Sequence, residues 1–311
     1  MKFASALVAW QRRHGRKGLP WQGTRDPYRI WLSEVMLQQT QVAAVIPYYE
    51  RFLRKFPTVD TLARADQDDV LRLWSGLGYY ARGRNLHAAA REIARQGEFP
   101  DTQKEISELP GVGRSTAAAI AVFAFGRRAA ILDGNAKRVL ARFFGVENPT
   151  WELAERCLPT KNVATYTQAL MDLGAMVCTR SRPACADCPV KPRCVARRAG
   201  RTAELPAPRP RKPVPVKRTT WLVLRRNNEV LLERRPAPGI WGGLWCFPEC
   251  DAEEVTNDAR ALEPIEHGFT HFACAFSPCC AKCAPSRCAR RRRVGAGWTS
   301  RRPQAPPCRR R

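Results

Sequence analysis

The chain has 311 residues, 13 of them cysteines, and carries a formal net charge of +25. This length suits about two domains with their own cores, and the charge favours a polyanionic partner, either nucleic acid or an acidic membrane surface. No apolar run reaches the roughly 18 residues of a membrane span, and the N-terminal apolar stretch is too short for a good signal peptide, so we expect a soluble, cytoplasmic protein. In that reducing compartment the cysteines need a role other than disulfide bonds.

The first elements are predicted to be helices. After a short amphipathic helix at the N-terminus, residues 28–56 predict two helices, the second opened by Pro47 at a position where proline is tolerated. Glu34 lies among apolar residues of the first of these two, and Gln38 and Gln41 follow at helical spacing on the same expected face. An acid on a largely apolar helix has either a raised pKa that serves a function or a place in a solvated surface stripe.

A glycine-containing loop interrupts the next helical region. Residues 58–97 predict two helices, with the stretch LWSGLGYYARGRNL (73–86) between them. Its two glycines are followed by Tyr79 and Tyr80 and then by basic residues, which suits a wedge inserted into a base stack. A helix-ending turn whose tyrosines pack on the core explains the same pattern, so both interpretations stay open at this point.

The stretch from 109 to 135, LPGVGRSTAAAIAVFAFGRRAAILDGN, combines a two-glycine turn with an Ala-rich helix predicted over 115–125. Gly111 and Gly113 allow close backbone approach, and the N–H groups that start the next helix suit a phosphate oxygen, although a tight helix–helix turn needs the same glycines. Asp133 follows in an Asp-Gly-Asn turn, and a carboxylate beyond a phosphate-binding hairpin suggests chemistry on a nucleotide. No strand-like alternation occurs before the cysteine-rich loop that comes next, so this part is predicted to be all-α.

Four cysteines then follow with the spacing Cys-x6-Cys-x2-Cys-x5-Cys, namely Cys178, Cys185, Cys188 and Cys194. Four thiolates in one short segment can hold a tetrahedral metal ion or a [4Fe–4S] cluster, and ligand type alone does not separate zinc from iron–sulfur. The irregular spacing lacks the paired Cys-x2-Cys knuckles of ordinary zinc ribbons. We expect the loop to present a positive surface to DNA through its basic residues, which are Lys191, Arg193, Arg197 and Arg198.

The remainder of the chain changes character. Residues 204–217 are Pro-rich and predict a stiff linker, and the following residues alternate like a β-hairpin with Asn227 and Asn228 at its turn. Residues 277–311 include 11 Lys or Arg and five Cys, without Asp or Glu, and show no strand pattern. A frameshifted or truncated gene end and a genuine basic DNA-binding tail both account for such a segment.

Several motifs together resemble the helix-hairpin-helix DNA glycosylases, and most closely the MutY-type adenine DNA glycosylases; they are SEVMLQQTQV, GLGYYARGRNL, LPGVGRSTAAAI, ILDGNAKRVL and the cysteine run. The resemblance implies an α + β fold, with an all-α glycosylase domain over 1–203 that carries a [4Fe–4S] cluster loop at 178–194. The sequence GIWGGLWCFPE is similar to part of that family's Nudix-like recognition domain, which implies a partial domain over 218–276 and leaves 277–311 as a basic tail. The family removes adenine mispaired with 8-oxoguanine or guanine, so the implied partner is double-stranded DNA with such mispairs, bound by a monomer at the bacterial nucleoid.

The resemblance also implies roles for individual residues. Glu34 matches the general acid that protonates adenine. Asp133 matches the carboxylate that stabilises an oxocarbenium-like sugar, and Asn135 matches an asparagine that assists near the sugar. Trp21 matches an aromatic residue near the adenine pocket, and the four cysteines match the cluster ligands. The residues matched to DNA contacts are Gln38, Leu77 and Tyr79 at the orphaned purine and the duplex wedge, Gly111, Val112 and Gly113 at the hairpin that holds the backbone, and Thr270 and His271 in the loop that reads 8-oxoguanine.

Ser115, which follows the hairpin and belongs with its DNA contacts, separates two activities within this superfamily. Endonuclease III-type relatives carry at this position a lysine that attacks the sugar and makes them strand-cleaving lyases, whereas a serine hydroxyl cannot form that Schiff base. We therefore expect a monofunctional glycosylase, in which Lys137 is close enough in sequence to trap an abasic sugar incidentally. The alternatives are an endonuclease III-like glycosylase/lyase and a non-catalytic DNA-binding protein with a structural cluster.

Overall fold

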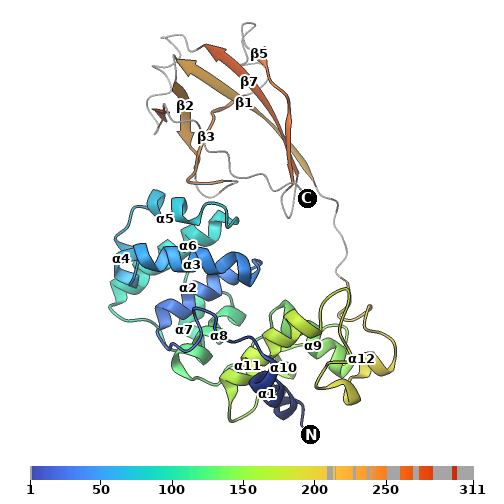
Figure 1. Cartoon of the computed structure of the whole chain (residues 1–311). Coiled ribbons are helices and arrows are strands. Elements are labelled where there is room, and N and C mark those ends of the chain that lie inside the picture. The colour runs from blue at the N-terminus through green and yellow to red at the C-terminus, as the bar shows by residue number, and fades with distance from the viewer. Residues whose placement is uncertain are drawn as a thin grey trace. The chain divides into compact units, whose positions relative to one another are not determined.

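The computed structural model describes residues 2–208, 213, 215–226, 229–236, 239, 241–250, 260–268, 273–282 and 296–299. The chain divides into two compact units, Met1–Arg209 and Pro210–Arg311, and the division falls in the Pro-rich segment that the sequence predicts as a linker (Figure 1). No helix in the described part is both long and apolar enough to cross a membrane.

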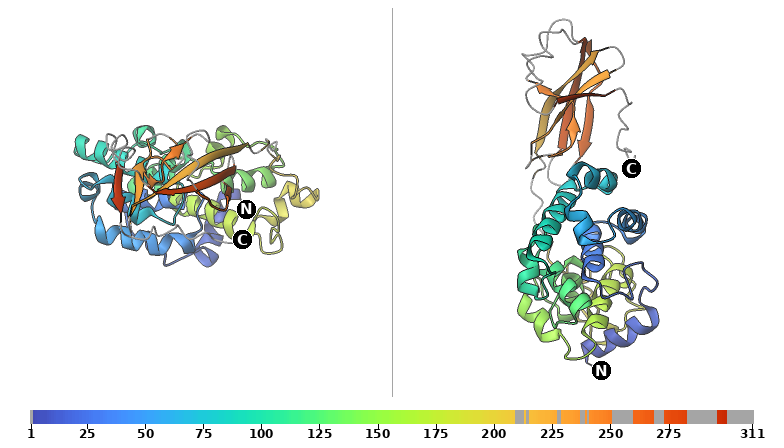
Figure 2. Two further views of the ribbon diagram at one scale, coloured as in Figure 1. Left: turned by 90° about the horizontal axis from the view of Figure 1, so that it is seen from above. Right: turned by 90° about the vertical axis from the view of Figure 1, so that its left-hand side faces the viewer.

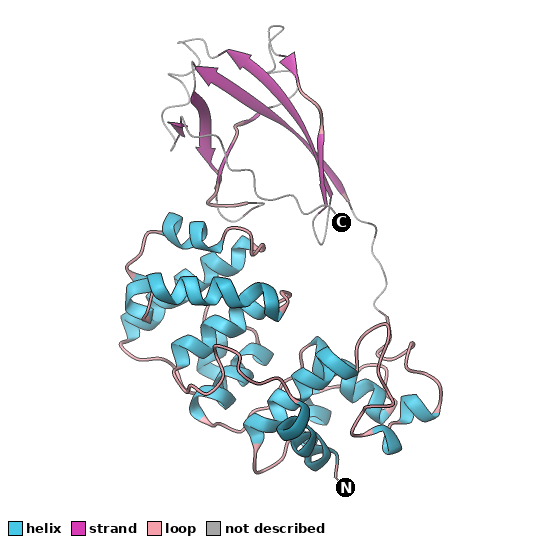
Figure 3. Ribbon diagram, in the orientation of Figure 1, coloured by secondary structure: helices cyan, strands magenta, loops and turns pink. Residues whose placement is uncertain are grey.

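The first unit is helical, and its described residues include no strand (Figure 3). The helices before the hairpin are α1 (Phe3–His14), α2 (Pro27–Leu37), α3 (Val42–Lys55), α4 (Val59–Ala63), α5 (Gln67–Trp74), α6 (Tyr80–Gln96) and α7 (Gln103–Glu108). After the hairpin come α8 (Arg114–Phe125), α9 (Gly134–Phe144), α10 (Trp151–Cys157), α11 (Val163–Asp172), the π-helical turn η1 (Leu173–Val177), the 3-10 turn η2 (Lys191–Arg193) and α12 (Val195–Arg198). The all-α prediction for this part is confirmed.

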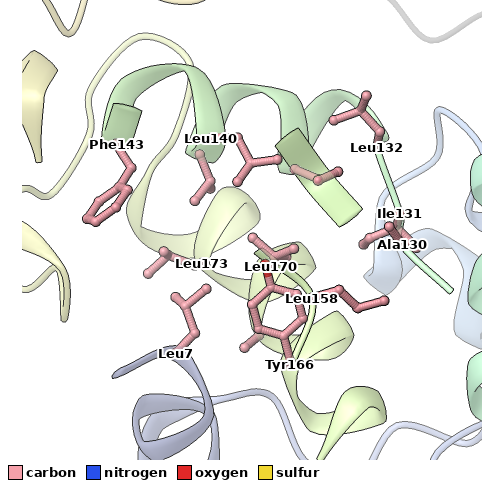
Figure 4. Close-up of a cluster of buried hydrophobic side chains, with 14 of the residues drawn as sticks. Leu7, Ala130, Ile131, Leu132, Leu140, Phe143, Leu158, Tyr166, Leu170 and Leu173 are labelled. Atoms are coloured by element: carbon pink, nitrogen blue, oxygen red, sulfur yellow. The ribbon is translucent and has the colours of Figure 1, made fainter. Parts of the chain in front are cut away.

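Two hydrophobic cores share α8. One core collects α1 with α9 to α11 (Figure 4), and the other collects α2 to α7. Ala118, Ala119 and Val122 of α8 pack into the first core, whereas Ala117 and Ile120 pack into the second. A helix that is buried on opposite faces has no polar stripe, and small side chains let its neighbours approach closely, which explains the Ala-rich sequence.

Helix α2 ends earlier than the spacing of its polar residues suggests. Its last residue is Leu37, so Gln38 and Gln41 lie in the following loop. The expectation that they share a helix face with Glu34 is therefore wrong. A long-range contact lies at this end: the carbonyls of Val35 and Met36 accept hydrogen bonds from Arg82 of α6, and the N–H of Gln38 donates to the carbonyl of Val35 in a tighter turn than an α-helix has.

Two further boundaries also correct the expectation. Helix α3 begins well before Pro47, which therefore lies inside this helix, where its missing N–H leaves one carbonyl of the preceding turn without a helical partner. The region 58–97 contains three helices instead of two, because Thr58 and Thr61 form a capping box that starts the short α4 separately. Helix α6 starts at Tyr80, inside the segment expected to be a loop.

The second unit contains a sheet with the strand order β3-β2-β1-β7-β5, to which β4, β6 and β8 attach at β1, β7 and β2, respectively (Figure 2). Its strands are β1 (Val216–Arg226), β2 (Glu229–Arg234), β3 (Trp245–Cys246), β4 (Glu249–Cys250), β5 (Arg260–Ala261), β6 (Ile265–Gly268), β7 (Ala273–Lys282) and β8 (Ala296–Thr299). The predicted hairpin consists of β1 and β2, which pair antiparallel, while its turn residues Asn227 and Asn228 lie outside the described residues. Because β1 and β7 pair in parallel, the sheet is mixed.

Two strands extend beyond Phe276, where the sequence shows no further strand pattern. β7 runs on to Lys282 in register with β1, and β8 pairs with β2. The expectation of a strandless segment is therefore wrong for residues 277–282 and 296–299. The sequence signal is weak because Ala and Cys, which are not typical strand residues, fill most positions of β7, and its partner β1 lies far away in the chain.

Candidate active site and nucleic-acid interface

Two carboxylates from different elements interact in the helical unit. Glu34 lies on α2, half-buried between the buried residues Ser33 and Val35. Asp133 precedes α9 and caps it by accepting a hydrogen bond from the N–H of Ala136 at 2.8 Å. Burial raises the pKa of Glu34 to about 8, and the charge of Asp133 adds to this rise, so the two groups are close enough to interact.

The surroundings of the two carboxylates differ. No hydrogen bond from the described part of the chain lowers the pKa of Glu34. Burial raises the pKa of Asp133 as well, but hydrogen bonds from backbone N–H groups at the start of α9 and the charge of Arg138 oppose that rise. Several contacts therefore oppose the rise in the pKa of Asp133, whereas a pKa of about 8 keeps Glu34 protonated at neutral pH.

Ser115 holds the segment that leads to Asp133. Its hydroxyl, on the first turn of α8, accepts a hydrogen bond from the backbone N–H of Leu132 at 3.0 Å. Ile131 and Leu132 are buried in the first core, so both packing and hydrogen bonding fix the backbone next to the carboxylate.

Arg138 connects Asn135 to the cysteine loop, and the sequence analysis does not identify this residue. It donates to Oδ1 of Asn135 at 2.7 Å, to the carbonyl of Gly174 at 2.6 Å and to the carbonyl of Cys178 at 2.7 Å. A Cβ atom at Gly174 would lie 2.6 Å from the Cβ of Asn135, so glycine is needed for η1 to approach α9 this closely. The only signal in the sequence is an arginine on a helix without acidic residues.

The loop between α5 and α6 presents Tyr79 but not Leu77. Tyr79 is 46% exposed and has a left-handed backbone conformation with φ of 50°, whereas Leu77 is 7% exposed and packs in the second core. The Leu77 side chain anchors the loop in this structure, and its match to a residue at the duplex wedge stays a prediction. Tyr80 packs against the second core, as the turn interpretation expects, whereas the exposure of Tyr79 is compatible with the wedge interpretation.

The hairpin between α7 and α8 has a backbone that only glycine allows. Gly111 has a φ of +77°, and a Cβ atom there would lie 2.7 Å from the Cβ of Asn85 in α6. Val112 is buried, while Gly111 and Gly113 are exposed. Gly113 is the N-cap of α8 and no side chain caps this end, so the first N–H groups of α8 are available to a ligand oxygen.

Gln38 lies beside this hairpin. Its Nε2 donates long hydrogen bonds to the carbonyl of Gly111 and to the hydroxyl of Thr116, each at 3.4 Å. The loop that follows the Glu34-bearing helix is thus in contact with the turn predicted to hold the DNA backbone.

The remaining predicted residues fall in three places. Trp21 is half-buried and packs edge-on against Tyr49, with 5.3 Å between ring centroids, at the edge of the core that surrounds α2. Lys137 is half-buried on α9. Thr270 and His271 lie outside the described residues.

The four predicted cysteine ligands line one pocket together with Arg142; they are Cys178, Cys185, Cys188 and Cys194. Arg142 is buried and donates a hydrogen bond to Sγ of Cys178 at 3.4 Å. Burial raises the pKa of Cys188 to about 11 and also raises the pKa of Cys194. The four basic residues expected around this loop are all exposed: Lys191, Arg193, Arg197 and Arg198.

The thiols are free in the described part of the chain, where no cysteine forms a disulfide. Among the same residues, no three Cys, His, Asp or Glu side chains are grouped closely enough to hold a single metal ion. The pocket therefore brings four thiols to one place without the tight spacing of a mononuclear site.

Two parts of the chain match known families. Residues 32–172 match the HhH-GPD superfamily of base excision DNA repair proteins, and residues 219–304 match the NUDIX domain. The second match extends past Phe276, in agreement with the positions of β7 and β8.

Relatives at high coverage share one name. The adenine DNA glycosylase of Buchnera aphidicola subsp. Baizongia pistaciae is 41% identical over 257 residues, which cover 79% of this chain and 73% of that protein. The adenine DNA glycosylase of Homo sapiens is 35% identical over 311 residues, which cover 79% of this chain and 57% of that protein.

Solved structures with the same fold include a DNA glycosylase and an endonuclease bound to DNA. A thermostable thymine-DNA glycosylase has a TM-score of 0.60 at 31% identity, over 63% of this chain and 95% of that chain. Endonuclease III in a non-covalent complex with DNA has a TM-score of 0.56 at 21% identity, over 63% of this chain and 94% of that chain, which supports the fold alone. Taken with the sequence relatives, these matches show that the chain belongs to the MutY-type adenine DNA glycosylase family, within the HhH-GPD superfamily of DNA glycosylases that hydrolyse N-glycosyl bonds in base excision repair.

Proposed function

We propose that this protein is a monofunctional glycosylase that removes adenine paired with 8-oxoguanine or guanine from double-stranded DNA in the cytoplasm. One observation carries the proposal: Glu34 and Asp133 are interacting carboxylates, and only Asp133 has hydrogen bonds and an arginine charge that oppose the rise in its pKa. Hydrolysis of an N-glycosyl bond needs both groups, because the base must gain a proton while the sugar develops positive charge.

Glu34 is the proton donor in this mechanism. Adenine is a poor leaving group as an anion, so its excision requires an acid. With a pKa raised to about 8, Glu34 remains protonated at neutral pH and donates its proton to N7 of adenine. The bond from C1′ to the base then breaks, its electron pair leaves with the base, and the sugar becomes an oxocarbenium-like cation.

Asp133 supplies the opposite charge. Its carboxylate stabilises the cation from a fixed position, since it is also the N-cap of α9 and cannot easily reorient. Arg138 holds Asn135 beside it for a supporting role near the sugar. Water then adds to C1′ and loses a proton, which produces an abasic site and leaves the DNA strand intact.

The absence of strand cleavage follows from Ser115. Its hydroxyl accepts the N–H of Leu132, so this position fixes the backbone before Asp133 and has no amine that could form a Schiff base. Lys137 on α9 is the nearest lysine in sequence to Asp133 and can trap an abasic sugar only as a side reaction.

DNA binding is proposed for the hairpin and the α5–α6 loop. The backbone at Gly111, Val112 and Gly113 and the uncapped start of α8 suit a phosphate. The exposed ring of Tyr79 suits insertion into the stack, which a base must leave before it reaches the carboxylates. Gln38, between α2 and the hairpin, is proposed to contact the orphaned purine, and Trp21 to lie near the extruded adenine.

We assign the cysteine pocket to a [4Fe–4S] cluster held by four thiolates, those of Cys178, Cys185, Cys188 and Cys194. The four thiols line one pocket in one short segment, so they are the residues that would hold the cluster. Because burial disfavours free thiolates, cationic iron would compensate their charge and would link residues 178–194 to the end of the helical domain. Metal analysis is expected to find iron at about four atoms per chain, whereas a single zinc and no iron would contradict this assignment.

The preference for 8-oxoguanine is assigned to the second unit. We propose a glycosylase domain over 1–203, a linker over 204–217 whose last two residues already belong to β1, and a recognition domain that continues from 218 and includes β7 and β8. Thr270 and His271 carry a hydroxyl and an imidazole, which can hydrogen-bond the edge that distinguishes 8-oxoguanine from guanine.

The test is single-turnover excision on duplexes with adenine opposite 8-oxoguanine, guanine or thymine. Product strands are read with and without alkali treatment. Alkali-dependent breaks at adenine opposite the two purines, and none opposite thymine, are the expected result. Strand breaks without alkali would instead indicate a lyase, and no breaks with any duplex would contradict the proposed function.

A further inference from the structure

Arg82 joins two loops that flank the carboxylate site. It lies on α6 and is 9% exposed. Its guanidinium donates to three carbonyls around the end of α2, those of Val35 at 3.1 Å, Met36 at 2.8 Å and Gln38 at 2.7 Å. It also donates to the hydroxyl of Thr40 at 3.1 Å and to two carbonyls of the α5–α6 loop, those of Leu77 at 3.3 Å and Gly78 at 3.2 Å.

Both loops hold a non-glycine residue in the left-handed conformation. Gln39 has a φ of 57° and Tyr79 a φ of 50°, and both side chains are exposed. Such conformations are strained and persist only where the surrounding structure fixes them. In each loop the carbonyl next to the strained residue, that of Gln38 or of Gly78, accepts a hydrogen bond from the guanidinium of Arg82.

The chemistry of this contact requires a guanidinium. No carboxylate in the described part of the chain forms an ion pair with Arg82, so backbone carbonyls provide its partial negative charge, including those at the C-terminus of α2. The pKa of Arg82 is lowered to about 10 by burial, so the group stays charged at neutral pH. Lysine has three donors around one nitrogen and cannot span both loops with the planar fork of arginine.

We propose that Arg82 is a positioning residue that locks loops 38–41 and 75–79 into one rigid unit, so that Gln39 and Tyr79 meet the duplex in a fixed arrangement when the base is extruded. This inference rests on the proposed base-excision function. Arg82 touches neither the base nor the sugar; it acts by pre-organising the residues that open the duplex. Pre-organisation of this kind lowers the ordering needed on binding.

The test measures duplex opening separately from chemistry. In the Glu34→Gln background, 2-aminopurine placed next to the mispaired adenine reports unstacking through its fluorescence when the protein binds. Arg82→Lys is expected to slow opening by about tenfold or more, because misplaced loops lose the near-ideal geometry. Thr40→Val removes one acceptor with little change of shape and is expected to slow opening less, in the same direction.

Arg91→Lys is the matched control. Arg91 lies on the same helix and donates to the carbonyl of Ala63 at 3.3 Å. Ala63 is the last residue of α4 and belongs to neither of the two loops that Arg82 contacts. It is expected to open DNA like the parent protein, with thermal unfolding recorded for every variant. Equal rates of duplex opening for Arg82→Lys and Arg91→Lys would overturn the inference. If Arg82→Lys does not fold, a Thr40→Val variant that opens the duplex as fast as the parent protein would overturn it. Loss of excision in the unmodified protein would instead contradict the proposed function, so the two failures are distinguishable.

Discussion

The helical unit and the sheet unit bury their side chains differently. The helical unit has two continuous cores on either side of α8. In the described residues of the sheet unit the buried apolar side chains are few: Leu222, Leu224, Leu231, Pro248, Phe276 and Pro278. Phe276 stacks on Trp221 and Trp241 with centroid distances of 4.2 and 5.2 Å, so ring contacts contribute much of the packing there.

This difference shows what each proposed task requires. A carboxylic acid keeps its proton at neutral pH when its surroundings hydrate the charged form poorly, and α2, whose neighbouring residues are buried in the second core, provides that environment for the half-buried Glu34. Reading the edge of a base needs hydrogen-bonding groups at a surface and no comparable core. The comparison therefore predicts that chemistry depends on the helical unit and that selectivity depends on the sheet unit.

The largest effect is expected from removal of the acid. Glu34→Gln keeps the size of the side chain but has no proton to donate, so single-turnover excision should fall by about 10²–10⁴-fold while mismatch binding is retained. Glu50→Gln on the exposed side of α3 is the matched control and should excise normally. Near-normal excision by Glu34→Gln would contradict the assignment.

Replacement of the second carboxylate comes next. Asp133→Asn should preserve the cap of α9, since asparagine caps helices as well as aspartate does. It removes the charge beside the sugar, and excision should fall by about 10²–10³-fold. Unchanged thermal unfolding together with the loss of rate would separate a catalytic effect from a structural one; a rate near that of the unmodified protein would count against electrostatic stabilisation.

The pH dependence of excision should be smaller and graded. Glu34 is active when protonated, so the single-turnover excision rate is maximal below its pKa of about 8 and falls as the pH rises through that value. Above it, single-turnover excision should decline by about tenfold per pH unit. An alkaline limb that begins near pH 5 would show that Glu34 is ionised at neutral pH and would contradict the buried-acid account.

The smallest change in rate is expected when the sheet unit is removed. A chain that ends at residue 208 retains both cores and both carboxylates, so excision opposite guanine should remain within about tenfold of the full chain. The preference for 8-oxoguanine over guanine should disappear in the same assay. If the shortened protein still favours 8-oxoguanine as strongly as the full chain does, the sheet unit is not the reader.

Local patterns predicted the helical unit well. The Gly-x-Gly hairpin, the Ala-rich α8 and the helix after Asp133 follow from turn chemistry and periodicity. The predicted bounds of α8, 115–125, differ from the observed ones by one residue. The family resemblance identified Glu34 and Asp133, and the structure adds the burial that raises both pKa values and the contacts that oppose the rise for Asp133.

The contacts that the sequence did not reveal are long-range. Arg82 contacts the end of α2 from a different helix, and Arg138 joins Asn135 to the cysteine loop across many residues. Neither contact leaves a periodic signal, because an arginine that binds carbonyls has no complementary acid to mark it. The extension of β7 past Phe276 escaped prediction for a similar reason, since its parallel partner β1 is distant in the chain.

The protonation state of Glu34 tests the central claim most directly. A carboxyl-carbon NMR titration of the labelled protein, with Glu34→Gln used to assign the resonance, would measure its pKa without DNA and without turnover. The account predicts a midpoint near pH 8 that moves down in Asp133→Asn, because the charge of Asp133 contributes to the rise. A midpoint near the ordinary glutamate value of 4.5, unaffected by Asp133→Asn, would contradict it.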